Sequence, residues 1–217
     1  MPFSFLSSLT PSPHHPLPGP SSNLVLSHAR KNMIMSVRGN HDISALSVSK
    51  GTKAVKPHQR DKYAWVEDIT DDDVRYLESL PCTISAVVGG EKYTIVHAGI
   101  LPGEPLSGQK VEDMTTMRLI HSPSSGVWET TEDDEKGVPW GGVYKGEEGT
   151  VIFGHDARRG LQEYDHAVGL DTGCVYGRSI TAVRIGGGDR EFISVQCEKE
   201  DGYAPVKGKR VECGQIE

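Results

Sequence analysis

Three strand-like runs in this sequence each end in a histidine, and this pattern constrains the fold more than any other feature. The stretch 33–42 is apolar at first and ends in Gly-Asn-His-Asp, the run 93–97 ends in a histidine, and the run 150–155 ends in Gly-His. In α/β proteins, ligand-binding groups gather outside the carboxyl ends of the strands. The pattern therefore predicts an α/β sheet with a functional site on one side of it.

The side chains at these positions suit metal binding and proton transfer. Asn40 offers a neutral oxygen to a metal ion, while His41, His97 and His155 can bind a metal or exchange protons near neutral pH. A single histidine after a strand is usually structural. Three histidines in the same setting favour a site.

Composition restricts the class of protein. A chain of 217 residues suits one domain, and its net charge of −7 argues against a general nucleic-acid-binding function. No apolar run approaches the length of a membrane helix, and the N-terminus lacks the features of a signal peptide. The four cysteines are widely spaced, which is typical of reduced thiols in a cytosolic or nuclear protein; they are Cys82, Cys174, Cys197 and Cys213.

Local patterns predict the elements around the site. Thr70 is expected to cap a helix that ends at Pro81, and Gly89-Gly90 to form a hairpin turn. The segment 44–61 is basic and irregular; it is either a solvated loop or a rim that attracts polyanions. Residues 122–148 are expected to form a mobile surface excursion that Trp140 anchors. Further strands are expected at 33–37, 83–88, 92–96, 151–153, 168–170, 179–185 and 192–195, and further helices at 23–31 and 111–120.

Four blocks together resemble the calcineurin-like metallophosphoesterases, in the order in which that family carries them. These blocks are Arg38-Gly39-Asn40-His41-Asp42, Val96-His97-Ala98-Gly99, the Phe-Gly-His-Asp-Ala-Arg-Arg-Gly run at 153–160, and the Gly-Leu-Asp-Thr-Gly-Cys-Val-Tyr-Gly run at 169–177. The branch they resemble is that of the symmetrical bis(5′-nucleosyl)-tetraphosphatases, which is related to the Ser/Thr phosphoprotein phosphatases. The resemblance implies an α/β fold, a four-layer αββα sandwich.

The sequence departs from the family pattern upstream of Gly39. The family carries an Asp-x-His motif and a Gly-Asp motif there, and this sequence has neither. We therefore expect a disordered Pro/Ser-rich leader at 1–22, a phosphoesterase domain at 23–197 that lacks its N-terminal strand or strands, and a charged tail at 198–217. A mispredicted start of the gene would also explain this departure.

The resemblance implies a role for each site residue. Asn40, His97 and His155 would ligate one of the family's two metal ions, and His41 would protonate the leaving group. Nitrogen-rich ligation suits Mn²⁺, Zn²⁺ or Fe. Arginines that follow the third histidine, Arg158 and Arg159, would bind substrate phosphate, although surface ion pairs are the alternative. At most one ion would be well ligated, because no carboxylate balances its charge.

Two functions are compatible with these residues. The first is metal-dependent hydrolysis of a phosphoric ester or anhydride, with a dinucleoside polyphosphate, polyphosphate or phosphoprotein as substrate. We expect this activity to be weak in the chain as written. The second is a non-catalytic relative that binds phosphate ligands or a partner protein. An aspartic protease would use the Asp-Thr-Gly triplet at 171–173, but such proteases need two triplets and the sequence has one, so we do not favour this function. A cytoplasmic protein that binds neither nucleic acid nor membrane is expected.

Overall fold

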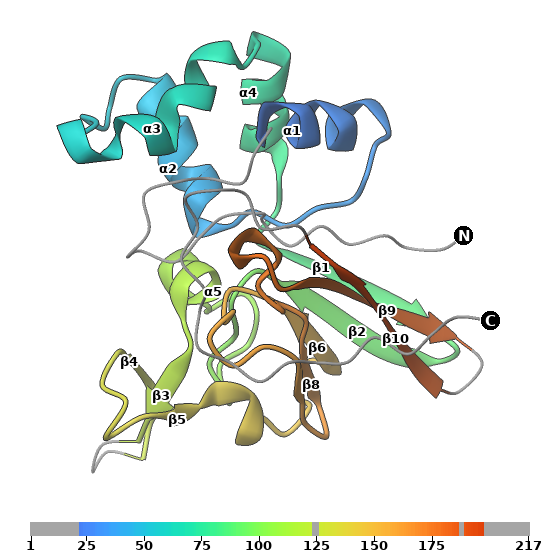
Figure 1. Ribbon diagram of the computed structural model, residues 1–217. Helices are drawn as coiled ribbons and strands as arrows, with labels where there is room; N and C mark the ends of the chain where they lie inside the picture. Colours follow the sequence, from blue (N-terminus) through green and yellow to red (C-terminus); the bar gives the residue numbers. More distant parts are fainter. Residues whose placement is uncertain (1–21, 123–125, 187–188, 198–217) are drawn as a thin grey trace.

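The structure is a computed structural model that describes residues 22–122, 126–186 and 189–197 (Figure 1). Of the leader predicted at 1–22, only Ser22 is described. The tail predicted at 198–217 lies outside the described residues.

A mixed five-stranded sheet forms the centre of the molecule. Its strands, in spatial order, are β1 (Thr83–Val88), β2 (Glu91–Val96), β6 (Thr150–Phe153), β8 (Ala167–Gly169) and β7 (Gln162–Glu163). The pairs β2–β6 and β6–β8 are parallel, and the outer pairs are antiparallel. The predicted hairpin is confirmed: Gly89 and Gly90 have φ values of 62° and 90°, which a two-residue turn of the favoured type requires.

Four helices lie together on one side of the central sheet (Figure 1). They are α1 (Ser22–Lys31), α2 (Asn40–Ser49), α3 (Arg60–Tyr63) and α4 (Asp71–Ser79), with 3-10 turns η1 (Pro57–Gln59) and η2 (Ala64–Asp68) between α2 and α4. The predicted cap of α4 is confirmed, because Thr70 accepts a hydrogen bond from Asp73 N and the Asp73 carboxylate accepts from Thr70 N. Among the described helices, none is long and apolar enough to span a membrane.

Three predictions of local structure need correction. The strand expected at 33–37 is wrong: residues 34–39 have no strand pairing, and Arg38 N donates to Pro81 O instead. An apolar run becomes a strand only where another strand lies beside it, which sequence periodicity does not report. The segment 44–61 is a loop only at 50–56, because α2 extends to Ser49 and η1 and α3 begin at Pro57 and Arg60. The helix expected at 111–120 is shorter, because α5 (Val111–Thr116) gives way to β3 (Leu119–His121).

A second, three-stranded sheet occupies the segment that was expected to be a surface excursion. Its strands β3, β4 (Glu129–Thr131) and β5 (Val138–Pro139) are followed by the 3-10 turn η3 (Trp140–Gly142). The anchor role predicted for Trp140 is confirmed. Its side chain is 1% exposed, packs against Phe153 and donates from Nε1 to Ala98 O at 3.1 Å. This bond fixes the backbone directly after His97.

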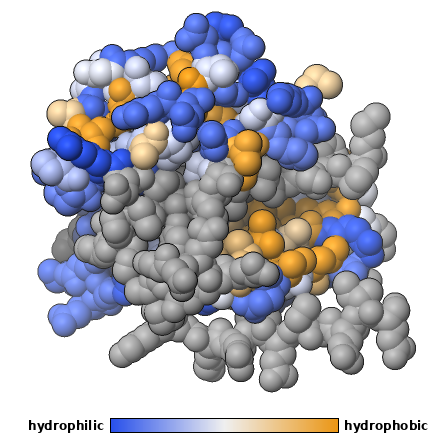
Figure 2. Space-filling model, turned by 45° about the horizontal axis from the view of Figure 1, so that its top comes forward, coloured by the Kyte–Doolittle hydropathy of each residue, from blue (hydrophilic) through white to orange (hydrophobic). Residues whose placement is uncertain are grey.

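A two-stranded hairpin, β9 (Ser179–Gly186) and β10 (Asp189–Gln196), packs against the central sheet through one of its faces. Val183, Ile185 and Phe192 join the core cluster of that sheet. The opposite face carries exposed Ile180, Ile193 and Val195. In the space-filling view, apolar side chains gather on the side where Figure 1 shows this hairpin, whereas the surface over the helices is mostly hydrophilic (Figure 2).

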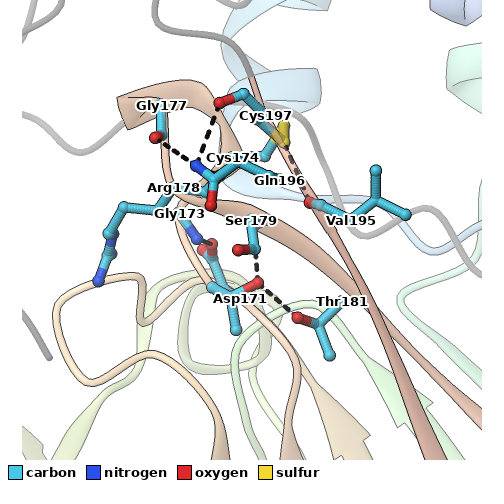
Figure 3. Close-up of a disulfide and its surroundings, with 11 residues drawn as sticks. Asp171, Gly173, Cys174, Gly177, Arg178, Ser179, Thr181, Val195, Gln196 and Cys197 are labelled. Carbon is cyan, nitrogen blue, oxygen red and sulfur yellow. Dashed lines mark hydrogen bonds between the residues drawn. A yellow bond between two sulfur atoms is a disulfide. The ribbon is translucent and has the colours of Figure 1, made fainter. Parts of the chain in front are cut away.

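A disulfide joins the two ends of this hairpin region (Figure 3). It pairs Cys174, in the 3-10 turn η4 (Cys174–Tyr176), with Cys197, directly after β10; the two Cα atoms are 5.3 Å apart. The prediction of reduced thiols is therefore wrong for this pair. The two cysteines are 23 residues apart in sequence, and only the antiparallel return of β10 along β9 brings them together. Cys82 is a free thiol, and Cys213 lies outside the described residues.

Replacing Trp140 with alanine should lower the free energy of unfolding by roughly 3–5 kcal/mol, because it leaves a cavity in the core and removes the bond to Ala98 O. Urea unfolding monitored by far-UV circular dichroism would measure this. Trp128→Ala is the matched control, since Trp128 is only half-buried, and should cost clearly less. Equal losses in the two variants would contradict the anchor role.

The disulfide should stabilise the fold by about 2–4 kcal/mol, because it closes a loop in the unfolded chain. We expect Cys174→Ser and Cys197→Ser to lose similar free energies of unfolding under oxidising conditions, and reductant to produce the same loss in the parent protein. Cys82→Ser should leave stability nearly unchanged. A parent protein whose stability is the same with and without reductant would refute the contribution of this bond.

Candidate active site

Parallel pairing of β2 and β6 brings the second and third predicted histidines together. Ile95 lies opposite Ile152 in the register, so the carboxyl ends of the two strands meet at the same edge. Gly154 N donates to His97 O at 2.9 Å and ties the two strand ends together. As a result, Nε2 of His97 lies 3.2 Å from Nδ1 of His155. The expectation that these histidines converge is confirmed.

His41, the first of the three predicted histidines, lies near His97 and His155 but belongs to a helix. Gly39 is the N-cap of α2, and its N–H donates to the Asp42 carboxylate at 2.7 Å. This capping interaction starts the helix at Asn40 and places His41 in the first turn, where its side chain is buried. Asp42 therefore positions the backbone at the start of α2.

Burial and neighbouring cations keep all three imidazoles neutral. Burial lowers the pKa of His41 to about 3, and the Lys62 ammonium is the next contributor. Burial, followed by the charge of Arg118, lowers the pKa of His97 to about 3. The pKa of His155 falls to about 2, mainly through burial and then through His97. At neutral pH the site therefore holds uncharged nitrogen donors in a positive electrostatic environment.

Two buried polar atoms at the start of α2 have no hydrogen-bond partner among the described residues. They are Asn40 Oδ1 and His41 Nδ1. A buried polar atom without a partner is costly, and it indicates a missing ligand or solvent molecule. Asn40 Oδ1 and the nitrogens of His97 and His155 are donor types that a divalent transition-metal ion accepts, and their joint binding of such an ion stays a prediction. Within the described ranges, no group of three or more His, Cys, Asp or Glu side chains forms a metal site.

The loop that carries His155 is held in a strained conformation. His155 has a φ of 66°, one of two positive values among the described non-glycine residues, and such strain is concentrated at functional sites. The following residue stabilises the loop: Asp156 is 3% exposed, and its carboxylate accepts from Arg159 at 2.7 Å and from Gln162 at 3.3 Å. On the other side, Arg178 donates to Ala157 O.

The Asp-Thr-Gly triplet forms a turn after β8 and supports this region (Figure 3). The Asp171 carboxylate accepts from Gly173 N at 3.1 Å, and Thr172 donates to Ser179 O at 2.6 Å. Burial raises the pKa of Asp171. These bonds give the triplet a structural role.

Both arginines predicted to bind phosphate already pair with carboxylates. Arg158 lies 3.1 Å from Asp134, and Arg159 lies 2.7 Å from Asp156. Arg158 is largely exposed and its pair is therefore weak, whereas Arg159 is tied to a buried partner. Substrate binding by either arginine stays a prediction.

Two cations at the site were not identified as site residues from the sequence. Arg118 donates from Nε to His155 O at 3.3 Å, and Lys62 Nζ lies 3.0 Å from His41 Nε2. Arg118 sits between two buried apolar residues, Met117 and Leu119. An isolated charged residue within an apolar run is a sequence signal from which Arg118 could have been identified. Lys62 lies directly after the basic segment 44–61.

The comparisons with known proteins agree on one group of hydrolases. No family model matches the chain. It is 28% identical over 242 residues to the symmetrical bis(5′-nucleosyl)-tetraphosphatase of Methylobacillus flagellatus, covering 88% of this chain and 84% of that protein. It is 27% identical over 236 residues to the enzyme of the same name from Paracidovorax citrulli, covering 83% and 84%.

A solved structure supports the same grouping. The chain is similar to the protein in the "Crystal structure of a putative diadenosine tetraphosphatase". The two sequences are 34% identical and the structures superpose with a TM-score of 0.69, over 82% of this chain and 75% of that one. The α/β fold class predicted from the sequence is confirmed by this similarity.

The histidine pKa values predict acid sensitivity of the metal-free protein. Each folded-state pKa lies below the unfolded value of 6.5, so between about pH 3 and pH 6.5 the unfolded chain binds more protons. Stability should fall with acidity by up to about 1.4 kcal/mol per pH unit for each histidine. Asp42 opposes this in part, because burial raises its pKa to about 6. Urea unfolding at neutral and mildly acidic pH measures the slope, which His97→Gln should reduce. A stability that does not change with pH would contradict the neutral buried imidazoles.

Proposed function

The chain belongs to the calcineurin-like metallophosphoesterases, with the symmetrical bis(5′-nucleosyl)-tetraphosphatases as its relatives, and we propose that it hydrolyses the phosphoanhydride bonds of dinucleoside polyphosphates. The observation that carries this proposal is the convergence of three neutral histidines flanked by Arg118 and Lys62. Neutral metal-binding groups within a positive field suit an anionic substrate that is attacked by water. Inorganic polyphosphate and phosphoproteins stay as predicted alternatives.

In this proposal, Asn40, His97 and His155 would hold a divalent ion. Such an ion, when bound, lowers the pKa of a water molecule and withdraws charge from the phosphoryl group. Mn²⁺, Zn²⁺ and Fe remain our candidates because the donors are mainly nitrogens. Arg118, held against the His155 carbonyl, would add fixed positive charge beside the attacked phosphoryl group.

His41 would transfer a proton to the leaving oxygen. Its low pKa in the ligand-free site means that the imidazole is neutral before substrate binds. A bound phosphate would bring negative charge next to His41, which raises its pKa and favours the imidazolium form. Substrate binding would thereby produce the acid that the reaction needs.

We also propose a cytoplasmic location, as predicted from the sequence. The disulfide between Cys174 and Cys197 removes the support that reduced thiols at these two positions would give. Fractionation of the native host cells with a specific antibody would test the location.

Hydrolysis of diadenosine tetraphosphate by the purified full chain tests the function directly. With Mn²⁺ present, we expect symmetrical cleavage to two molecules of ADP, separated by anion-exchange chromatography. His41→Ala should lower kcat by roughly 10²–10⁴-fold, the usual contribution of a general acid. His121→Ala is the matched control, because His121 lies on β3 beside Glu129, and should retain activity.

A folded parent protein that releases no ADP with any of the three metals would contradict the proposal. Binding of the intact nucleotide under those conditions would favour the non-catalytic alternative. Release of ATP and AMP in place of ADP would refute symmetrical cleavage.

A further inference from the structure

Two lysines of the segment between α2 and η2 lie near His41. Lys62 donates to His41 Nε2 at 3.0 Å. Lys53 donates to Ser44 Oγ at 3.1 Å and to Tyr63 Oη at 3.3 Å. Both ammonium groups lie over the Tyr63 ring, 5.5 Å and 5.6 Å from its centroid. Because Tyr63 is 6% exposed, it forms a fixed support between them.

Neither of these two cations has a carboxylate partner among the described side chains, unlike several other basic residues. Lys50 pairs with Glu78, and Arg158 pairs with Asp134. Of the carboxylates whose side chains are described, none lies within ion-pairing distance of Lys53 or Lys62. Two neighbouring, partly buried ammonium groups repel one another. An anion bound between them would remove this repulsion.

The position of the pair identifies which part of a substrate it would meet. His41 is the residue proposed to protonate the leaving oxygen, and Lys62 contacts Nε2 of the same imidazole. In hydrolysis of an anhydride, a water oxygen bonds to the attacked phosphorus and loses a proton to solvent, and the bond from phosphorus to the bridging oxygen breaks. The electron pair stays on the leaving phosphate, whose negative charge increases. In hydrolysis of a simple monoester, the leaving group is an alcohol that carries no further phosphate.

We propose that Lys62 and Lys53 form a binding site for the leaving phosphates of a polyphosphate chain and thereby select anhydrides over monoesters. This inference rests on the proposed function for its chemistry, but it predicts a binding property that can be measured without turnover. Lys62 would contact the phosphate next to the cleaved bond, and Lys53 the phosphate beyond it.

Calorimetric titration of the metal-free full chain tests the site, with inorganic tripolyphosphate and orthophosphate as probes. Lys62→Gln should weaken tripolyphosphate binding by at least about tenfold, since it removes a charge-assisted hydrogen bond. Orthophosphate binding should change by less than about threefold, because a single phosphate does not need both lysines. Lys62→Arg keeps the charge and should retain most of the affinity.

Lys56→Gln is the matched control. Lys56 is an exposed residue of the same segment, so this variant makes the same change in net charge and should bind tripolyphosphate as the parent does. Circular dichroism confirms that each variant is folded. If Lys62→Gln and Lys56→Gln weaken binding equally, the effect is general attraction, and the site is refuted.

The two proposals fail in different ways. Loss of tripolyphosphate affinity in Lys62→Gln, in a protein that hydrolyses no diadenosine tetraphosphate, would keep the binding site and refute the catalytic function. Unchanged tripolyphosphate affinity in Lys62→Gln would overturn the binding site even if the parent protein is an active hydrolase. In an active protein, the variant should also lower kcat/KM for diadenosine tetraphosphate by about tenfold relative to p-nitrophenyl phosphate.

Discussion

The parallel pairing of β2 with β6 is the constraint on which the candidate site depends. The register that places Ile95 opposite Ile152 also places His97 next to the loop of His155. A slip of one residue would turn every side chain of one strand to the other face, and the two imidazoles would separate. The hydrogen bond from Gly154 N to His97 O holds this register at the ends of the two strands. The Trp140 indole donates to Ala98 O and so fixes the backbone of the residue after His97.

The site combines groups from two parts of the molecule. The central sheet contributes His97 and His155, whereas the helical part contributes His41 at the start of α2 and Lys62 at α3. In our proposals, each part has its own task. The sheet supplies donors for a metal ion, whereas the helices supply the proton for the leaving group and the side chains that bind it. The capping bond between Gly39 and Asp42 fixes where the helical side begins.

The charge around the three histidines is positive, although the net charge of the chain is negative. The net charge is −7, yet the cations nearest the three histidines are Arg118, Lys53 and Lys62, and each lowers the pKa of at least one of them. A local positive field within an acidic protein attracts small anions while the rest of the surface repels large ones. The distribution is therefore better suited to a nucleotide than to a nucleic acid.

Local features could be predicted from the sequence alone: the Thr70 cap, the Gly89-Gly90 turn, and the strand ends that carry His97 and His155. Each of these depends on neighbours within a few residues, or on the rule that parallel strands end at one edge. The tertiary structure alone decided that residues 33–37 form no strand, that Cys174 meets Cys197, and that Arg118 and Lys62 border the histidines. Lys62 and His41 are 21 residues apart, and Arg118 and His155 are 37 apart. Contacts over such separations depend on how elements pack, because no local pattern records which side chains packing will bring together.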